Sequence, residues 1–155
     1  DRMTLIYIMF GFKPSNPGEV YQPDDTFNMQ QPQVQAAIVK LCDSMMADPS
    51  LQISVKGTSC WPKMFSDWLV STGSMFPSQS LEADLRAWLT GPAPSWVQKD
   101  SVGFSDNGSW KPYWLRLNFR VDFDSHSSGI QTKRFMEAWE NKVLRESQRL
   151  SVEGF

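Results

Sequence analysis

Residues Trp114–Asp124 have the sequence WLRLNFRVDFD, in which apolar and polar residues alternate from Leu115 onward. In a β-strand, side chains at every second position lie on the same face of the sheet. The apolar set comprises Leu115, Leu117, Phe119, Val121 and Phe123, and the polar set comprises Arg116, Asn118, Arg120 and Asp122. We therefore predict a strand with one face in the core and the other against solvent or a partner.

The segments on either side of this strand predict a hairpin and a helix. Val102–Phe104 is a shorter apolar run, and Asp106-Asn107-Gly108 between the two runs is typical of a hairpin turn. After the strand, Ser127 and Ser128 are suited to cap a long helix. The buried stripe of that helix is expected to contain Phe135, Trp139, Val143 and Leu150.

The N-terminal part predicts one strand and one helix. Leu5–Phe12 (LIYIMFGF) is rich in β-branched and aromatic residues, which is typical of a strand covered on both faces. A connection rich in proline and glycine follows over residues 13–25. Pro32 suits the first turn of a helix, and apolar residues then recur at the helical period, so we predict a helix over Pro32–Met46.

Two short helical patterns follow, over Met64–Val70 and Leu81–Leu89. We place them in a helical insertion at about residues 61–95, between the first helix and the second strand. With this insertion, the order of elements is the split βαβ pattern of a ferredoxin-like α+β sandwich. We predict one domain over residues 1–155, in which Ser151–Phe155 begins a last strand that the sequence cuts short.

Composition excludes several classes of protein. The 155 residues carry 15 Lys and Arg against 17 Asp and Glu, and the basic residues are scattered. Such a surface has little charge with which to neutralise phosphates, so we expect no nucleic-acid partner. The longest apolar run, Met3–Phe12, is shorter than the roughly 20 residues that cross a bilayer. Because the sequence opens with neither an initiator methionine nor a signal peptide, we expect it to be part of a longer protein.

Residues that could carry catalysis are few. His126 is the only histidine, and it stands beside serine and aspartate in the sequence DSHSS. Sequence neighbours do not converge as a catalytic triad does, and this composition is typical of turns and helix caps. One histidine with two distant cysteines does not make a zinc site, and no glycine-rich phosphate loop is present. We therefore expect no enzymatic activity, no metal and no cofactor; a hydrolase that uses serine and His126 is the weakest alternative.

Three other features are candidates for modification or contact. Cys42 and Cys60 are either bonded, which would stabilise the fold by roughly 3 kcal/mol, or two buried thiols in a reducing compartment. Asn107-Gly108-Ser109 fits the N-glycosylation sequon at a predicted exposed turn. Most tryptophans should lie in the core, but three lie in or beside predicted loops and could line an apolar contact surface. These three are Trp61, Trp96 and Trp110.

Short motifs along the chain carry a resemblance to a known family. The first strand ends in Gly11-Phe12-Lys13-Pro14, followed by Gly18. The other motifs are Pro23, Phe27-Asn28, Leu41-Cys42 in the first helix, Cys60 before Phe65 and Trp68, and Phe135 with Trp139 in the last helix. Together they resemble Dispatched and its relatives in the resistance-nodulation-division (RND) transporter superfamily, in which a similar G-x-K-P-x-x-x-G run opens the second ectodomain.

The resemblance implies a place and a role for the chain. Dispatched, Patched and the Niemann-Pick type C transporters carry two ferredoxin-like ectodomains above their membrane helices, and this chain would be the second one. It would lie on the extracellular or lumenal side, with Cys42 and Cys60 bonded. Its partners would be the rest of the membrane protein, including the other ectodomain, and a lipid or lipid-modified cargo such as a Hedgehog-like ligand.

The role implied for the domain is contact with cargo or with partner domains. In the family, ion coupling depends on acidic residues of the membrane helices, which lie outside such an ectodomain. The alternative that we retain is a free-standing ferredoxin-like binding or scaffold module.

Overall fold

The computed structural model describes residues 4–13, 16, 18–56, 60–105, 108–124 and 126–153. It has a mixed α/β structure, in which three strands form an antiparallel sheet in the order β1-β3-β2. The strands are β1 (Thr4–Phe10), β2 (Val102–Phe104) and β3 (Pro112–Val121). The helices are α1 (Pro32–Met46), α2 (Trp61–Ser71), α3 (Leu81–Leu89) and α4 (Gly129–Val152), with short helical turns η1 (Pro49–Leu51) and η2 (Val97–Ser101).

The alternating segment forms the central strand, as predicted. In β3, the side chains of Leu115, Leu117, Phe119 and Val121 are buried, whereas the polar residues between them are partly exposed. The strand ends at Val121, and Phe123 beyond it stacks on Phe135 of α4, with ring centroids 4.2 Å apart. The predicted pairing of β2 with β3 is also confirmed, whereas Asp106 and Asn107 of the expected turn lie outside the described residues.

The prediction that the first strand is covered on both faces is wrong. Along β1, half-buried residues alternate with exposed ones, and Leu5, Tyr7 and Met9 are 45%, 48% and 41% exposed. Ile6, Ile8 and Phe10 instead face the core. The run is apolar throughout because one face of β1 packs on the core and the other exposes apolar side chains. No second layer of structure covers that other face among the described residues.

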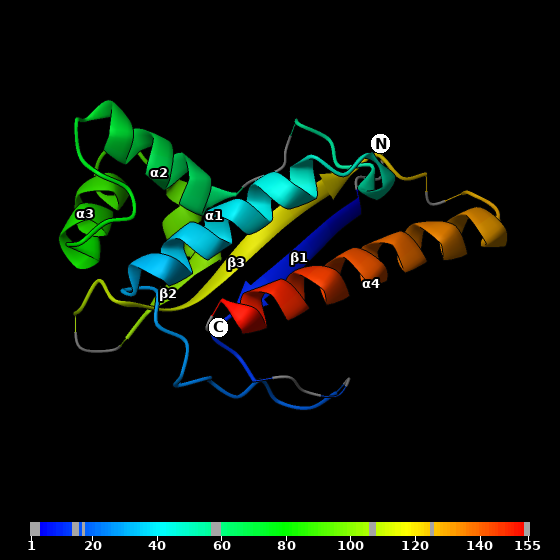
Figure 1. Ribbon diagram of the computed structural model, residues 1–155, viewed down its shortest axis with the longest axis horizontal. Coiled ribbons are helices and arrows are strands. Elements are labelled where there is room, and N and C mark those ends of the chain that lie inside the picture. The colour runs from blue at the N-terminus through cyan, green and yellow to red at the C-terminus, as the bar shows by residue number, and fades with distance from the viewer. Residues whose placement is uncertain are drawn as a thin grey trace.

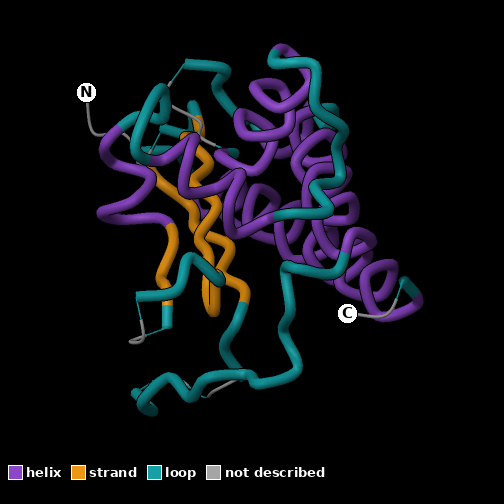
Figure 2. Tube along the Cα trace, turned by 90° about the vertical axis from the view of Figure 1, so that its left-hand side faces the viewer, coloured by secondary structure: helices purple, strands orange, loops and turns teal. Residues whose placement is uncertain are grey.

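Helices α1 and α4 cover the core-facing side of the sheet. In Figure 1, α1 runs alongside β3 and α4 runs alongside β1, and in Figure 2 the strands lie to one side of most helical turns. Trp139 of α4 joins these layers: its ring lies 5.9 Å from the ring of Phe119 on β3, and its indole N–H donates to the carbonyl oxygen of Leu51 at 3.1 Å. α1 has the predicted bounds, and Ser128 and Gln131 form a capping box at the start of α4.

The segment between α1 and β2 is helical. α3 has its predicted bounds, whereas α2 begins earlier than predicted, at Trp61 with Pro62 in its first turn. Figure 1 shows α2 and α3 at the end of the molecule that also holds β2. Their apolar faces join the main core through buried aromatic residues, chiefly Trp61, Phe65 and Trp88.

The C-terminal segment does not begin the strand that we expected. Ser151 and Val152 belong to α4, so the last strand that we expected to begin at Ser151 does not begin there. Arg149 stabilises this final turn, because its guanidinium contacts Glu146 and Glu153, each at 2.8 Å, one turn away on the same helix. Within the described residues, no helix is both long and apolar enough to span a bilayer.

Candidate functional site

The face of the sheet opposite α1 and α4 is the first candidate. We call it the open face and define it by Leu5, Tyr7, Met9, Arg116, Asn118 and Arg120. The register places Leu5 opposite Arg120, Tyr7 opposite Asn118 and Met9 opposite Arg116. An apolar row on β1 thus lies beside a polar, basic row on β3. Apolar side chains exposed in a row on a sheet are typical of a contact surface.

The polar atoms of the open face are incompletely satisfied. The guanidinium carbon of Arg116 lies 4.6 Å from the centroid of the Tyr7 ring, which is a cation–π geometry. Nε of Arg116 and Oδ1 of Asn118 are shielded from solvent and have no hydrogen-bond partner among the described residues. Shielded polar atoms without partners cost free energy, so a surface that supplied a donor and an acceptor here would be bound favourably.

One end of the open face is aromatic. Phe12 lies between Trp114 and Tyr21, with ring centroids 6.2 and 5.7 Å apart, respectively. Trp114 lies over Gly103 on β2, where a Cβ atom would come within 1.8 Å of the indole nitrogen. Only glycine therefore permits this position of the Trp114 ring, which fixes the aromatic end to the edge strand β2.

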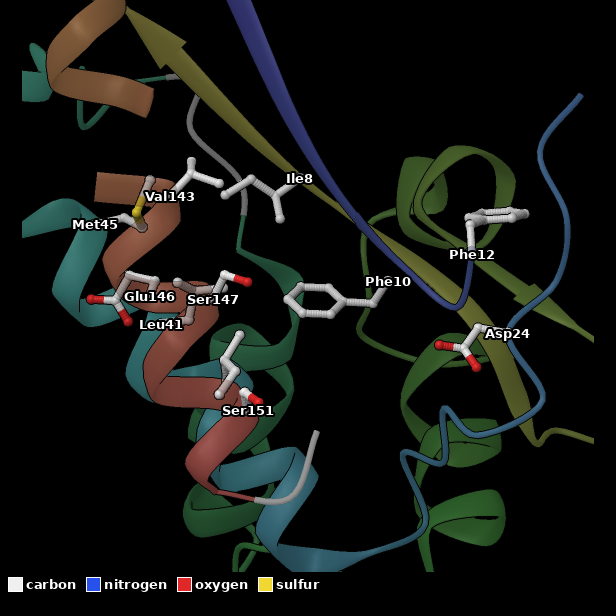
Figure 3. Close-up of a pocket in the computed structure, with 11 residues that line it drawn as sticks. Ile8, Phe10, Phe12, Asp24, Leu41, Met45, Val143, Glu146, Ser147 and Ser151 are labelled. Atoms are coloured by element: carbon white, nitrogen blue, oxygen red, sulfur yellow. The ribbon is translucent and has the colours of Figure 1, made fainter. Parts of the chain in front are cut away.

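A groove between β1, α1 and α4 is the second candidate. It has a volume of about 390 Å³, and Figure 3 shows Ile8 and Phe10 of β1 pointing toward α4. The other lining residues are Phe12, Asp24, Leu41, Met45, Val143, Glu146, Ser147, Leu150 and Ser151. Most of these side chains are apolar, so the groove suits an apolar ligand or a polypeptide segment.

Glu146 is the buried carboxylate of this groove, and it joins α4 to α1. It accepts hydrogen bonds from Ser44 of α1 at 2.5 Å and from Arg149 at 2.8 Å, and Lys142 lies 3.3 Å away. Burial alone would raise the pKa of Glu146, but the hydrogen bonds from Ser44, Arg149 and Lys142 outweigh it and hold the pKa below its ordinary value. Glu146 is therefore ionised and paired at neutral pH.

Asp24 is the other acidic residue of the groove, and it lies near Phe12 (Figure 3). Its Oδ1 accepts hydrogen bonds from the hydroxyl and the backbone N–H of Thr26 at 2.6 and 3.0 Å. These bonds lower the pKa of Asp24, and the charge of Lys13 adds a smaller effect in the same direction. Asp24 thus keeps a negative charge, and its contacts with Thr26 are those of a turn at the surface.

Cys42 and Cys60 form a disulfide bond, which connects α1 to the start of α2. Their Cα atoms are 6.2 Å apart, and both residues are buried in the core. The bond therefore attaches the α2–α3 segment to the helix that covers the sheet.

The three tryptophans proposed as contact residues do not share one environment. Trp61 is fully buried and its indole N–H donates to the carbonyl oxygen of Ser101 at 3.1 Å, so its prediction as a surface residue is wrong. The reason is that α2 begins at Trp61, which turns a predicted loop residue into a core residue. Trp96 and Trp110 are half-buried against the core, and Trp110 meets Phe104 edge-on at 5.2 Å.

Two candidate residues remain, Asn107 and His126. Asn107 lies outside the described residues. His126 is exposed, and its backbone N–H donates to Oδ1 of Asp124 at 2.8 Å, which is turn chemistry. Among the residues that the structure describes, no three His, Cys, Asp or Glu side chains are grouped to hold a metal ion.

Sequence reasoning missed the contribution of β1 to the open face and the groove beside it. The alternation of Thr4–Phe10 is hidden, because exposed and core-facing positions are both apolar. The signal that could have revealed it was Arg116, Asn118 and Arg120 on the neighbouring strand, since paired strands share their exposed face. No known family model, curated protein or solved structure matches the chain.

Proposed function

We propose that the chain is an extracellular or lumenal domain of a Dispatched-like RND transporter that moves or releases lipid or lipid-modified cargo. Its role is contact with cargo and with partner domains. The observation that carries this proposal is the open face, where the apolar side chains of Leu5, Tyr7 and Met9 lie beside the arginines of β3. A domain that works by contact needs such a surface, whereas a reaction would need converging catalytic groups.

The topology supports the finer assignment to a ferredoxin-like sandwich. The antiparallel strands have the order β1-β3-β2, α1 follows β1, and α4 follows β3. These are the first five elements of the split βαβ pattern, with α2, α3 and η2 between α1 and β2. Such domains occur in pairs in RND transporters, and the sequence motifs of this chain resemble theirs.

The disulfide bond supports the proposed location. Disulfide bonds persist in oxidising compartments, which include the extracellular space and the lumen of the secretory pathway. The bond between Cys42 and Cys60 is buried, so it belongs to the folded core. Glycosylation of Asn107 is part of the same proposal: treatment of the protein from a eukaryotic host with a glycosidase should lower its mass, and Asn107→Gln should abolish that change.

In this proposal, the open face is the surface that meets the other ectodomain of the transporter. Contact there would bury the three apolar side chains of β1 and supply partners for Nε of Arg116 and Oδ1 of Asn118. Trp96 and Trp110, which are half-buried, remain candidates for cargo contact on the same domain.

The deciding test is the coding sequence on both sides of the chain, scanned for hydropathy with a window of about 19 residues. We expect a membrane-spanning segment just before residue 1, several more after residue 155, and an acidic residue within one of them. A self-contained gene without such segments would overturn the transporter proposal and favour the free-standing binding or scaffold module.

A further inference from the structure

The chain has three tyrosines, and their surroundings differ. Tyr7 lies within β1, where the guanidinium carbon of Arg116 is 4.6 Å from the centroid of its ring. Tyr113 lies at the start of β3, between the basic residues Lys111 and Arg116 in the sequence. Tyr21 lies outside the helices and strands and is 64% exposed, the most exposed of the three. An enzyme that modifies tyrosine side chains therefore reaches Tyr21 most easily.

The residues around Tyr21 are acidic. Within five residues on either side stand Glu19, Asp24 and Asp25, and no lysine, arginine or histidine. Neither of the other two tyrosines has an acidic residue in the same interval. Tyr113, in its basic surroundings, is therefore the matched comparison for Tyr21 within the same chain.

The structure holds two of these acidic side chains in their ionised form. Glu19 accepts hydrogen bonds from the side-chain amide and the backbone N–H of Asn16, each at 3.0 Å, and these bonds lower its pKa. The bonds from Thr26 lower the pKa of Asp24 in the same way. Both carboxylates therefore keep their charge even at the mildly acidic pH, about 6, of late secretory compartments.

The backbone beside Tyr21 is held in place, whereas its side chain stays accessible. The backbone N–H of Lys13 donates to the carbonyl oxygen of Gln22 at 2.9 Å, directly after Tyr21. The ring of Tyr21 leans on the ring of Phe12, with centroids 5.7 Å apart, and most of the residue is still exposed. The fold thus presents this phenol at the surface.

An exposed tyrosine in an acidic segment suits the transfer of a sulfonate group. The donor in this reaction is an adenosine phosphosulfate, which carries several negative charges, so its transferase needs a basic active site. A basic site attracts an acidic segment and repels a basic one. Tyr21 meets this requirement, whereas Tyr113 does not.

We propose that Tyr21 is a site of tyrosine sulfation. Its phenol oxygen attacks the sulfur of the adenosine phosphosulfate and forms a new O–S bond. The S–O bond to the phosphate of the donor breaks, and the phenol proton passes to a base of the transferase. The inference rests on the extracellular or lumenal location proposed above, which the disulfide bond between Cys42 and Cys60 also supports.

Sulfation changes the charge at the aromatic end of the open face. Tyr21 contacts Phe12, which in turn contacts Trp114. The sulfate ester adds a fixed negative charge beside these rings, and modifications that add charge act on nearby contacts by attraction and repulsion. The modified surface favours a partner with basic side chains at this end.

The test uses the intact, oxidised chain, a purified tyrosine sulfotransferase and a donor with a radiolabelled sulfate group. We expect incorporation of label into the folded chain, and Tyr21→Phe should abolish it. Tyr113→Phe is the matched control and should leave incorporation unchanged. Mass spectrometry of peptides from the digested chain identifies the modified tyrosine.

The role of the acidic residues is tested by neutralising them. Glu19→Gln together with Asp25→Asn should lower the rate of incorporation at least about tenfold, and high salt should reduce the difference. Glu137→Gln together with Glu140→Gln, at exposed positions of α4, makes the same change in net charge and should leave the rate unchanged. Circular dichroism will verify that the variants fold.

Three results would each overturn the proposal. These are no incorporation into the folded chain, incorporation that persists in Tyr21→Phe, and equal rates for the two double variants. Incorporation into the reduced, denatured chain alone would also count against it, because the fold would then hide Tyr21 from the transferase. The assay does not involve the flanking membrane segments, so its failure is distinguishable from failure of the transporter proposal.

Discussion

The two ends of the molecule are held together by different forces. At the closed end, formed by α2, α3, η2 and β2, Trp61, Phe65 and Trp88 are buried against one another, and a disulfide bond connects α2 to α1. At the open end, formed by β1 and the C-terminal half of α4, the core-facing residues of β1 are only half-buried, Val143 is exposed, and an ionised carboxylate joins the two long helices. We infer that the closed end supplies most of the stability, whereas the open end leaves surface for binding.

The first prediction concerns the packed core of the closed end, where a substitution should cost the most stability. Phe65→Ala should lower the free energy of unfolding by about 3–5 kcal/mol, because the ring is fully buried between Trp68 and Trp88. Urea unfolding followed by tryptophan fluorescence will measure this loss. Met64→Ala, at the preceding exposed position, is the control and should cost less than about 1 kcal/mol. Similar costs for both variants would contradict a tightly packed closed end.

The next prediction concerns the disulfide bond between Cys42 and Cys60. The double variant Cys42→Ala, Cys60→Ala should lose about 3 kcal/mol, because the bond closes a loop with a sequence separation of 18 residues and thereby restricts the unfolded chain. Urea unfolding of the oxidised and reduced wild-type chain should show a similar difference. The intact mass should rise by two hydrogens on reduction, and an unchanged mass would show that the bond does not form.

The third effect concerns the carboxylate of the open end. Glu146→Gln should cost about 1–3 kcal/mol at pH 7, because it leaves Lys142 and Arg149 without their buried partner. Glu137→Gln removes an exposed pair with Lys133 and is the matched control, with an expected cost below about 0.5 kcal/mol.

Because the pKa of Glu146 is lowered, we also expect the stability of the fold to depend on pH. The pKa of Glu146 is lower in the folded state than in the unfolded state, so its contribution is present above the unfolded pKa and is lost as the pH falls through the folded one. Thermal unfolding between about pH 7 and pH 3 should therefore show a steeper loss in the wild type than in Glu146→Gln. Parallel curves would mean that Glu146 does not contribute to the acid sensitivity.

The elements that could be predicted from the sequence are those with a clear separation of apolar and polar faces. β3, α1 and α3 follow patterns in which apolar and polar residues fall on separate faces, so their existence and most of their bounds could be predicted. The pairing of Cys42 with Cys60 was one of two open possibilities, because spacing alone does not fix the redox state.

The errors cluster where one local pattern fits two arrangements. An apolar run such as Leu5–Phe10 fits a strand covered on both faces or one that offers an apolar surface, and only the position of the helices decides between them. Trp61 fits a loop or a helix start before proline, and the burial of its ring depends on contacts with Trp88 from a distant segment. The groove depends on three elements far apart in the sequence, so no local pattern predicts it.

The last prediction concerns the contact between Tyr7 and Arg116 on the open face. Tyr7 and Arg116 are cross-strand neighbours in a cation–π geometry at 4.6 Å, on a face that solvent still reaches. A double-mutant cycle with Tyr7→Leu and Arg116→Met should give a coupling energy of only about 0.5–1 kcal/mol in urea unfolding, because water still reaches part of both side chains. A coupling above about 2 kcal/mol would mean that the pair is structural, like the contacts of the closed end. A small coupling would mean that the pair adds little to the stability of the fold, so that both side chains are available for contact with a partner.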